Sequence, residues 1–197
     1  MYRHLFIEGP IQTGKSTLLK NFLQPYSNDT AGFTCQRLTD KNGQTIAFRL
    51  GSADSTPLTA PYSPAADNIF RIIAGEKKGY NNINVFDTAA DLINAEENKR
   101  IILLDEIGGI EMLNESFRAT LYNTLAGTVP CIGVIKQKNK AAAMSTADLN
   151  NESISFYNNQ LRQAITQNNG VILEYKRNDT ALQKKIKDFL SGVFPIR

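Results

Sequence analysis

Residues 9–16 constrain this sequence more than any other segment, because they fit the pattern G-x-x-x-x-G-K-[ST] at every fixed position. The apolar run at residues 5–8 predicts a buried strand before the pattern, and residues 14–24 predict a helix after it that Pro25 stops. Glycines at such a turn let backbone N–H groups point inward at an anion, and the helix N-terminus adds partial positive charge. The sequence therefore predicts a phosphate-binding loop between a strand and a helix.

Two side chains in this loop have the chemistry that a bound triphosphate requires. The Lys15 ammonium is expected to reach the β- and γ-phosphates, and the Ser16 hydroxyl is expected to ligate Mg²⁺. Backbone N–H groups of residues 12–16 are expected to face the phosphates. The nucleotide-binding residues predicted from the pattern are Gly9, Pro10, Ile11, Gln12, Thr13, Gly14, Lys15 and Ser16.

A second motif lies at residues 100–106, where a continuous apolar run ends in Asp105 and Glu106. A carboxylate at the C-terminal end of a buried parallel strand is typical of the group that holds the Mg²⁺ of a nucleotide. We expect Asp105 to hold that ion through water, and Glu106 to orient or deprotonate an attacking water. An acidic turn without function is the alternative, and the phosphate loop earlier in the chain favours the catalytic interpretation.

The rest of the chain alternates between strand and helix patterns, which predicts a mostly parallel sheet with helices on both faces. The expected strands lie at residues 5–8, 32–38, 45–50, 82–86, 101–104, 131–135 and 171–175. The expected helices lie at residues 14–24, 65–76, 87–99, 115–126, 153–167 and 180–190. Together with the phosphate-binding loop, this pattern makes a three-layer α/β sandwich of the P-loop type the expected fold class.

Three segments depart from that alternation. Asn42-Gly43 is a strong hairpin signal, so the strands on either side of it are expected to form an antiparallel addition to the sheet. Residues 51–64 contain three prolines and predict a long surface loop without regular structure. Residues 136–140 are basic and follow a strand, which fits either a solvated loop or a lid over the site.

The composition is that of a folded protein without a strongly charged target. The length of 197 residues predicts one domain, residues 1–197, and the net charge of +3 gives no sign of a nucleic-acid partner. No run approaches the ~18 apolar residues of a membrane span, and the apolar start is too short for a signal peptide. We therefore expect a cytoplasmic monomer in which Cys35 and Cys131 stay reduced.

The motifs around the second carboxylate pair also resemble a known family. Asp105-Glu106-Ile107-Gly108, followed by Glu111-Met112 and Phe117, is similar to the second signature of the nucleoside-triphosphatase family typified by the thermophilic and human cancer-related nucleoside triphosphatases. Further segments resemble that family in the same order: Gly32-Phe33-Thr34, Ala47-Phe48, Tyr80 and Val85. The resemblance spans residues 5–135 and weakens beyond them. The family's late Asn-Arg-Asp element corresponds to Arg177-Asn178-Asp179, in altered order.

The resemblance implies a RecA-like P-loop fold and Mg²⁺-dependent hydrolysis of ATP, GTP and other nucleoside triphosphates to diphosphates. It adds Thr17 to the phosphate loop, assigns Asp105 to Mg²⁺ and makes Glu106 the catalytic carboxylate. The second residue that we expect to be catalytic is Lys15, because its ammonium reaches the β- and γ-phosphates. Glu111 matches a motif glutamate whose role stays open.

Two other functions stay open at this point. A P-loop kinase of a small molecule or nucleoside would use the same loop but needs an acceptor pocket. A nucleotide-binding regulatory module would hydrolyse slowly and expose its bound state to a partner. The residues able to offer positive charge to a transition state are Arg37, Arg49, Arg71 and Arg118, and surface or salt-bridge roles are the alternative for each. His4, at the entry of the first strand, is expected to be structural or on the surface.

Overall fold

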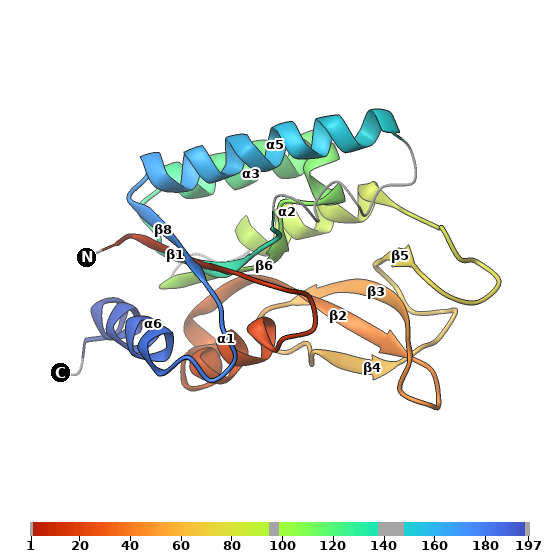
Figure 1. Cartoon of the computed structure of the whole chain (residues 1–197), viewed down its shortest axis with the longest axis horizontal. Helices are drawn as coiled ribbons and strands as arrows, with labels where there is room; N and C mark the ends of the chain where they lie inside the picture. Colours follow the sequence, from red (N-terminus) through yellow and green to blue (C-terminus); the bar gives the residue numbers. More distant parts are fainter. Residues whose placement is uncertain (1, 95–98, 138–147, 196–197) are drawn as a thin grey trace.

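The computed structural model describes residues 2–94, 99–137 and 148–195. Its centre is an eight-stranded sheet in the order β5-β3-β2-β6-β7-β1-β8, with β4 paired to β2 off this path (Figure 1). The strands are β1 His4–Glu8, β2 Thr30–Thr39, β3 Thr45–Ser52, β4 Thr59–Pro61, β5 Ile69–Ile72, β6 Ile101–Ile107, β7 Cys131–Ile135 and β8 Gly170–Glu174.

The sheet consists of a parallel part and an antiparallel part that meet at β2. The pairs β2–β6, β6–β7, β7–β1 and β1–β8 are parallel, and β2–β3 and β3–β5 are antiparallel. Strands β6 and β7 are buried along nearly their whole length, as continuous apolar runs in a covered parallel sheet are expected to be. The predicted hairpin around Asn42-Gly43 is therefore present, as the β2–β3 pair.

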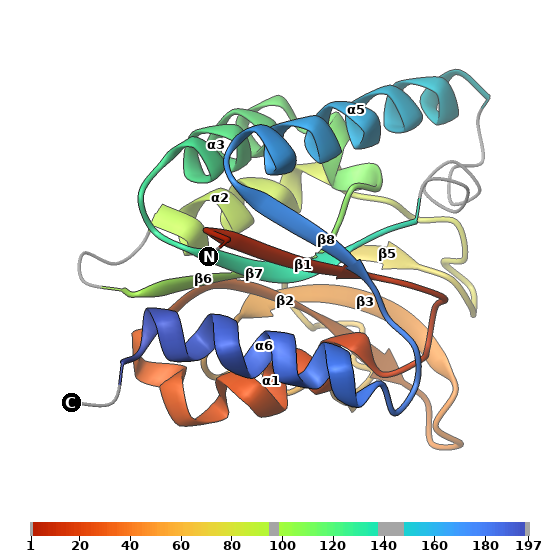
Figure 2. The ribbon, with the colours of Figure 1, turned by 60° about the vertical axis from the view of Figure 1, so that its left-hand side comes forward.

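Helices cover both faces of the sheet, as Figure 2 shows. One face carries α1 and α6, and the other carries α2, α3 and α5. Each face has its own apolar cluster, with Leu19 and Ile186 in the first and Phe117 and Leu161 in the second, all fully buried. The helices are α1 Lys15–Leu23, α2 Phe86–Asn94, α3 Glu115–Ala126, α5 Asp148–Gln167 and α6 Thr180–Val193.

The helix ends follow sequence signals that satisfy unpaired backbone groups. The Asn114 side chain accepts a hydrogen bond from the Phe117 N–H at 2.8 Å, and so caps α3 as predicted. The Asp179 side chain accepts from the Leu182 N–H at 2.9 Å and caps α6. Asp179, a member of the late family element, therefore has a structural role at the start of this helix.

Two predicted elements in the middle of the chain are wrong. Residues 65–76 do not form a helix, because Ile69–Ile72 is strand β5, paired to β3. Residues 82–86 are not a strand: Ile83–Val85 is a short 3₁₀ helix that the Asn82 side chain caps, and it leads into α2. In both cases tertiary pairing or local side-chain capping overrides the apolar pattern.

Several predicted boundaries also differ. The loop at residues 51–64 is not without regular structure, since β3 extends to Ser52 and Thr59–Pro61 forms β4 along β2. Helix α2 starts one residue before Asp87, which lies in its first turn rather than at its cap, and Lys99 is outside any helix. The remaining helices and strands agree with prediction within a few residues. Most of the basic segment at 136–140 lies outside the described residues.

Within the described ranges, no helix combines the length and the apolar character that crossing a bilayer requires.

Candidate active site

The predicted phosphate loop lies between the end of β1 and the start of α1. Gly14 has φ 97°, a left-handed conformation that glycine adopts without strain, and it turns the chain into the helix. The Thr13 hydroxyl donates to the Pro10 carbonyl at 2.8 Å, and the Tyr175 hydroxyl after β8 donates to the Thr13 carbonyl at 3.1 Å. The loop is thus held in shape from within and from the last strand.

The Lys15 ammonium lies across this loop. Its Nζ donates to the Gly9 carbonyl at 3.0 Å and to the Pro10 carbonyl at 2.6 Å, and the residue is buried. A cation held on the loop's own carbonyls is close to the position at which the backbone N–H groups would bind phosphate.

Asp105 faces the start of α1 from the end of β6. Its Oδ1 accepts from the Ser16 hydroxyl at 2.7 Å, and its Oδ2 accepts from the Thr34 hydroxyl at 3.0 Å and the Cys35 N–H at 3.1 Å. Three donors from two other elements therefore orient a carboxylate that is 1% exposed. The two residues predicted to hold Mg²⁺, Ser16 and Asp105, are in direct contact.

The side chains of Asp105 and Glu106 lie near the same cavity because β6 is irregular at its C-terminal end. In a regular strand, consecutive side chains point to opposite faces of the sheet. The β6–β7 register shifts between Leu104 and Ile107, and Glu106 has φ 62°, a left-handed conformation rare outside glycine. The bulge turns Glu106 into the cavity beside the loop, while Asp105 stays buried behind Ser16.

Burial and the neighbouring Glu106 carboxylate both disfavour the charged form of Asp105. Desolvation, followed by repulsion from Glu106, raises the pKa of Asp105 to about 6, although its three hydrogen bonds act in the opposite direction. Desolvation and the Asp105 charge also raise the pKa of the Cys35 thiol well above its ordinary value. Two carboxyl groups therefore lie close together at the end of β6, one of them buried.

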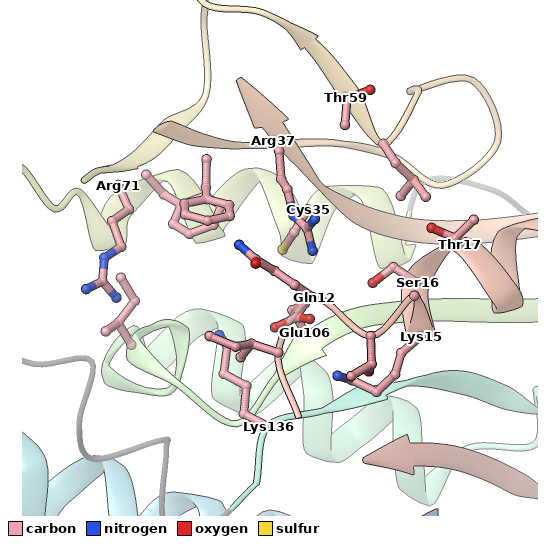
Figure 3. Close-up of a pocket in the computed structure, with 17 residues that line it drawn as sticks. Gln12, Lys15, Ser16, Thr17, Cys35, Arg37, Thr59, Arg71, Glu106 and Lys136 are labelled. Atoms are coloured by element: carbon pink, nitrogen blue, oxygen red, sulfur yellow. The ribbon is translucent and has the colours of Figure 1, made fainter. Parts of the chain in front are cut away.

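A cavity of about 350 Å³ opens directly in front of the phosphate loop. Residues 11–17 and Glu106 line it, as do side chains from β2, β3 and β5 (Figure 3). Gly9, Pro10 and Asp105 do not line it: the first two begin the loop, and the third lies behind Ser16. The structure thus brings the other predicted site residues to one cavity wall.

The sequence interpretation missed a buried ion pair at this wall. The Lys136 Nζ, directly after β7, lies 3.1 Å from Glu111 Oε2, and the other oxygen of Glu111 accepts from the Gly109 N–H. Burial lowers the pKa of the Lys136 ammonium, but the charges of Glu111 and Glu106 outweigh that effect and raise it above its ordinary value. Lys136 is therefore a fixed cation that lines the cavity.

The position of Lys136 follows from the strand order, which the sequence alone does not give. Strand β7 lies between β1 and β6, so the first residue after it falls between the phosphate loop and the two carboxylates. The motif glutamate Glu111 now has a structural role, as the partner that holds Lys136.

The four candidate arginines separate into two pairs. Arg37 and Arg71 line the cavity. Arg49 instead pairs with Asp67 at 3.1 Å, and Arg118 donates to the Met112 carbonyl and lies 4.1 Å from the ring centre of Tyr157. His4 is fully buried and structural, with one ring nitrogen bonded to the Leu125 carbonyl and the other to the Cys131 N–H.

Comparison with known proteins places this geometry in context. The family model described as NTPase matches residues 4–168. No curated protein sequence matches the chain.

Two solved structures share the fold along nearly the whole chain. The human cancer-related nucleoside triphosphatase, known from a solution structure, is 17% identical with a TM-score of 0.59, and the match covers 99% of each chain. THEP1 from the hyperthermophile Aquifex aeolicus is 17% identical with a TM-score of 0.60, covering 96% of this chain and 98% of THEP1. At such identity the likeness establishes the fold, and the predicted P-loop α/β class is confirmed.

Proposed function

This chain belongs to the NTPase family, and from that premise we propose that it is a Mg²⁺-dependent nucleoside triphosphatase that releases phosphate from ATP, GTP and other nucleoside triphosphates. The observation that carries the proposal is the 2.7 Å contact between Ser16 Oγ and Asp105 Oδ1 beside the phosphate loop, with Glu106 on the cavity side of the same strand end. The expected cytoplasmic location and monomeric state belong to the proposal as well.

Binding of the triphosphate is assigned to the loop. The backbone N–H groups of residues 12–16 and the N-terminus of α1 would hold the phosphates, and Thr17 completes the set of binding residues. Lys15, now on the Gly9 and Pro10 carbonyls, would transfer its hydrogen bonds to the β- and γ-phosphate oxygens. The exchange replaces two neutral acceptors by charged ones, so it strengthens each bond.

The donor set fits Mg²⁺. A hydroxyl and a carboxylate in contact supply the oxygen ligands that this ion prefers, and Mg²⁺ in nucleotide sites takes its other ligands from phosphate and water. Ser16 and Asp105 would therefore hold the ion, and when bound it would neutralise phosphate charge. Thr34 and Cys35 fix the Asp105 carboxylate for that task.

Glu106 and Lys136 are assigned to the chemical step. The Glu106 carboxylate, turned into the cavity by the bulge, would orient the attacking water and accept its proton. The Lys136 ammonium, held by Glu111, would stabilise the negative charge that develops on the transferred phosphoryl group.

Phosphate release from a panel of nucleoside triphosphates, measured with and without Mg²⁺ and without any acceptor, tests this proposal. We expect turnover that requires Mg²⁺ and changes little with the base, because the residues assigned to binding contact phosphate. Formation of diphosphate only when an acceptor molecule is added would indicate a kinase instead. Tight retention of nucleotide with turnover only after a partner is added would indicate a regulatory module.

A further inference from the structure

A row of side chains crosses four strands on the far side of the cavity. Arg37 on β2 is paired in register with Phe48 on β3 and with Thr59 on β4, and Phe48 is paired with Arg71 on β5. Residues paired in this way point to the same face of a sheet. All four residues line the cavity, so the antiparallel part of the sheet supplies a wall with an aromatic ring between two guanidinium groups.

The Arg71 end of this wall lies beyond the position expected for the γ-phosphate. In Figure 3, Thr17 and Ser16 lie at one end of the cavity, Glu106 near its middle and Arg71 at the opposite end. Since Lys15 and Ser16 address the β- and γ-phosphates and Glu106 faces the attacking group, the nucleoside extends away from Glu106. The Arg71 end is therefore not the side on which the nucleoside of a bound triphosphate lies.

Neither arginine of the wall forms an ion pair within the part of the chain that the structure describes. Among the side chains of residues 2–94, 99–137 and 152–195, neither Arg37 nor Arg71 has a carboxylate within ion-pair distance, whereas Arg49 on the opposite face of β3 pairs with Asp67. Partial burial lowers the pKa of the Arg71 guanidinium, and no described carboxylate counters this. A partly buried cation without a counter-ion is costly, and an anionic ligand would remove that cost.

The surface between the arginines is apolar. The Phe48 and Phe70 rings are stacked with centres 6.3 Å apart, and Leu58 and Ile110 are further apolar residues of the cavity lining. Phe70 is buried and Phe48 is half-buried, so one ring of the pair is accessible from the cavity. An aromatic body can stack on such a ring while its charged group reaches a guanidinium.

We propose that this wall, formed by Arg37, Phe48, Phe70 and Arg71, is a binding subsite for a second molecule, an aromatic phosphate, which occupies the cavity together with the triphosphate. Two guanidinium groups match the double negative charge of a phosphate monoester better than the single charge of a carboxylate. The inference rests on the proposed function in one respect, that the first nucleotide fills the phosphate loop.

The test is calorimetric titration at pH 8 of protein saturated with Mg²⁺ and β,γ-imido-ATP, whose unreactive γ-phosphate keeps other phosphates off the loop. Phenyl phosphate is the probe, benzoate is the matched aromatic carboxylate, and inorganic phosphate lacks the ring. We expect phenyl phosphate to bind with a dissociation constant of about 1 mM or below, and the other two to bind at least fivefold more weakly.

Substitutions in the wall test whether phenyl phosphate binds there. Arg71→Gln and Phe48→Ala are each expected to weaken phenyl phosphate at least tenfold while the affinity for the ATP analogue stays within twofold. Arg49→Gln is the matched control, since Arg49 is also on β3 but faces away from the row. It is expected to leave both affinities unchanged.

Several outcomes would overturn the inference. These are no binding of phenyl phosphate to the loaded protein, equal or tighter binding of benzoate or inorganic phosphate, or binding unaffected by Arg71→Gln. Loss of analogue affinity in the wall variants would also overturn it, because the wall would then belong to the first nucleotide. Failure of the analogue itself to bind would instead contradict the proposed function, so the two failures are distinguishable.

Discussion

Asp105 and Glu106 are neighbours in the chain but have opposite surroundings. Asp105 is almost fully buried and accepts three hydrogen bonds, while Glu106 is held in a left-handed conformation at the cavity wall. Strain of about 1–3 kcal/mol is typical of a non-glycine residue in such a conformation, and it persists where the surrounding structure imposes it. At the residue scale, this bulge gives the two neighbouring carboxylates different surroundings, and so allows the proposed metal-binding role of Asp105 to differ from the proposed proton-accepting role of Glu106.

The Lys136 ammonium is expected to act on turnover more than on substrate binding. Lys136→Gln should lower kcat at least tenfold with a smaller change in KM, because charge develops on the phosphoryl group in the transition state. The single variant also leaves Glu111 buried without its partner, which destabilises the fold. Steady-state kinetics with Glu111→Gln/Lys136→Gln, which leaves no unpaired charge, gives the cleaner test. Full turnover in this double variant would reduce Lys136 to a structural role.

The single histidine of the chain should make stability fall in acid. Burial is the main cause that lowers the pKa of His4 from its ordinary value of 6.5. The ring is neutral: Nε2 donates to the Leu125 carbonyl and Nδ1 accepts from the Cys131 N–H. The unfolded chain therefore binds a proton more readily, and His4 stabilises the fold fully above pH 6.5 and less as the pH falls below it.

Denaturant unfolding between pH 7.5 and 5.5 measures this effect, with His4→Gln as the comparison. The wild-type free energy of unfolding should decline across this window more steeply than that of the variant. Parallel declines would show that other groups cause the acid sensitivity.

At the scale of elements, the central strands approach each other so closely that some positions admit only glycine. A Cβ on Gly32 in β2 would lie 2.1 Å from the Leu103 carbonyl oxygen in β6, and Gly32 has φ +97°. Gly79 has the same φ, but nothing lies within 4 Å of a Cβ built there. Comparing a substitution at Gly79 with the same substitution at Gly32 therefore distinguishes the cost of backbone strain from the cost of steric overlap.

We therefore expect unequal costs for the same substitution at these two glycines. Gly79→Ala should cost about 1–2 kcal/mol from strain alone, and Gly32→Ala about 3 kcal/mol or more, because β2 must move away from β6. Thermal and denaturant unfolding of both variants provides the measurement. Equal losses would show that the β2–β6 contact is not tightly packed.

The sequence predicts elements well where one strong signal dominates and poorly where several weak ones compete. The continuous apolar runs of β6 and β7 and the side-chain cap of α3 were each enough to place their elements. Residues 65–86 have mixed apolar spacing, so their structure depends on the pairing with β3, which a single sequence does not show, and on the Asn82 cap, a short local signal that the apolar pattern obscured. The parallel pairing of β4 with β2 is likewise a tertiary effect.

The candidate site likewise has features that the sequence predicts and features that it does not. The phosphate loop and the carboxylate pair could be predicted because their residues are contiguous in the chain. The Lys136–Glu111 pair and the row from Arg37 to Arg71 could not, since strand order and register bring their members together. The family resemblance was confirmed. It was based on short motifs of contiguous residues, so it did not predict these two features.

On the scale of the whole molecule, the parallel and antiparallel parts of the sheet have separate roles around one cavity. The parallel part supplies the phosphate loop, Asp105, Glu106 and Lys136 from strand ends, as ligand sites of open α/β sheets do. The antiparallel addition supplies the facing wall. The helices contribute little to the cavity beyond the start of α1.

The central claim is that Glu106 performs the chemical step on a triphosphate that the loop binds. The most direct measurement compares Mg²⁺-dependent phosphate release with Mg·ATP affinity in wild type and Glu106→Gln, with Lys15→Ala as the reference for lost binding. We predict that Glu106→Gln keeps its affinity within about twofold while turnover falls at least tenfold, and that Lys15→Ala loses affinity itself. Unchanged turnover in Glu106→Gln would contradict the account.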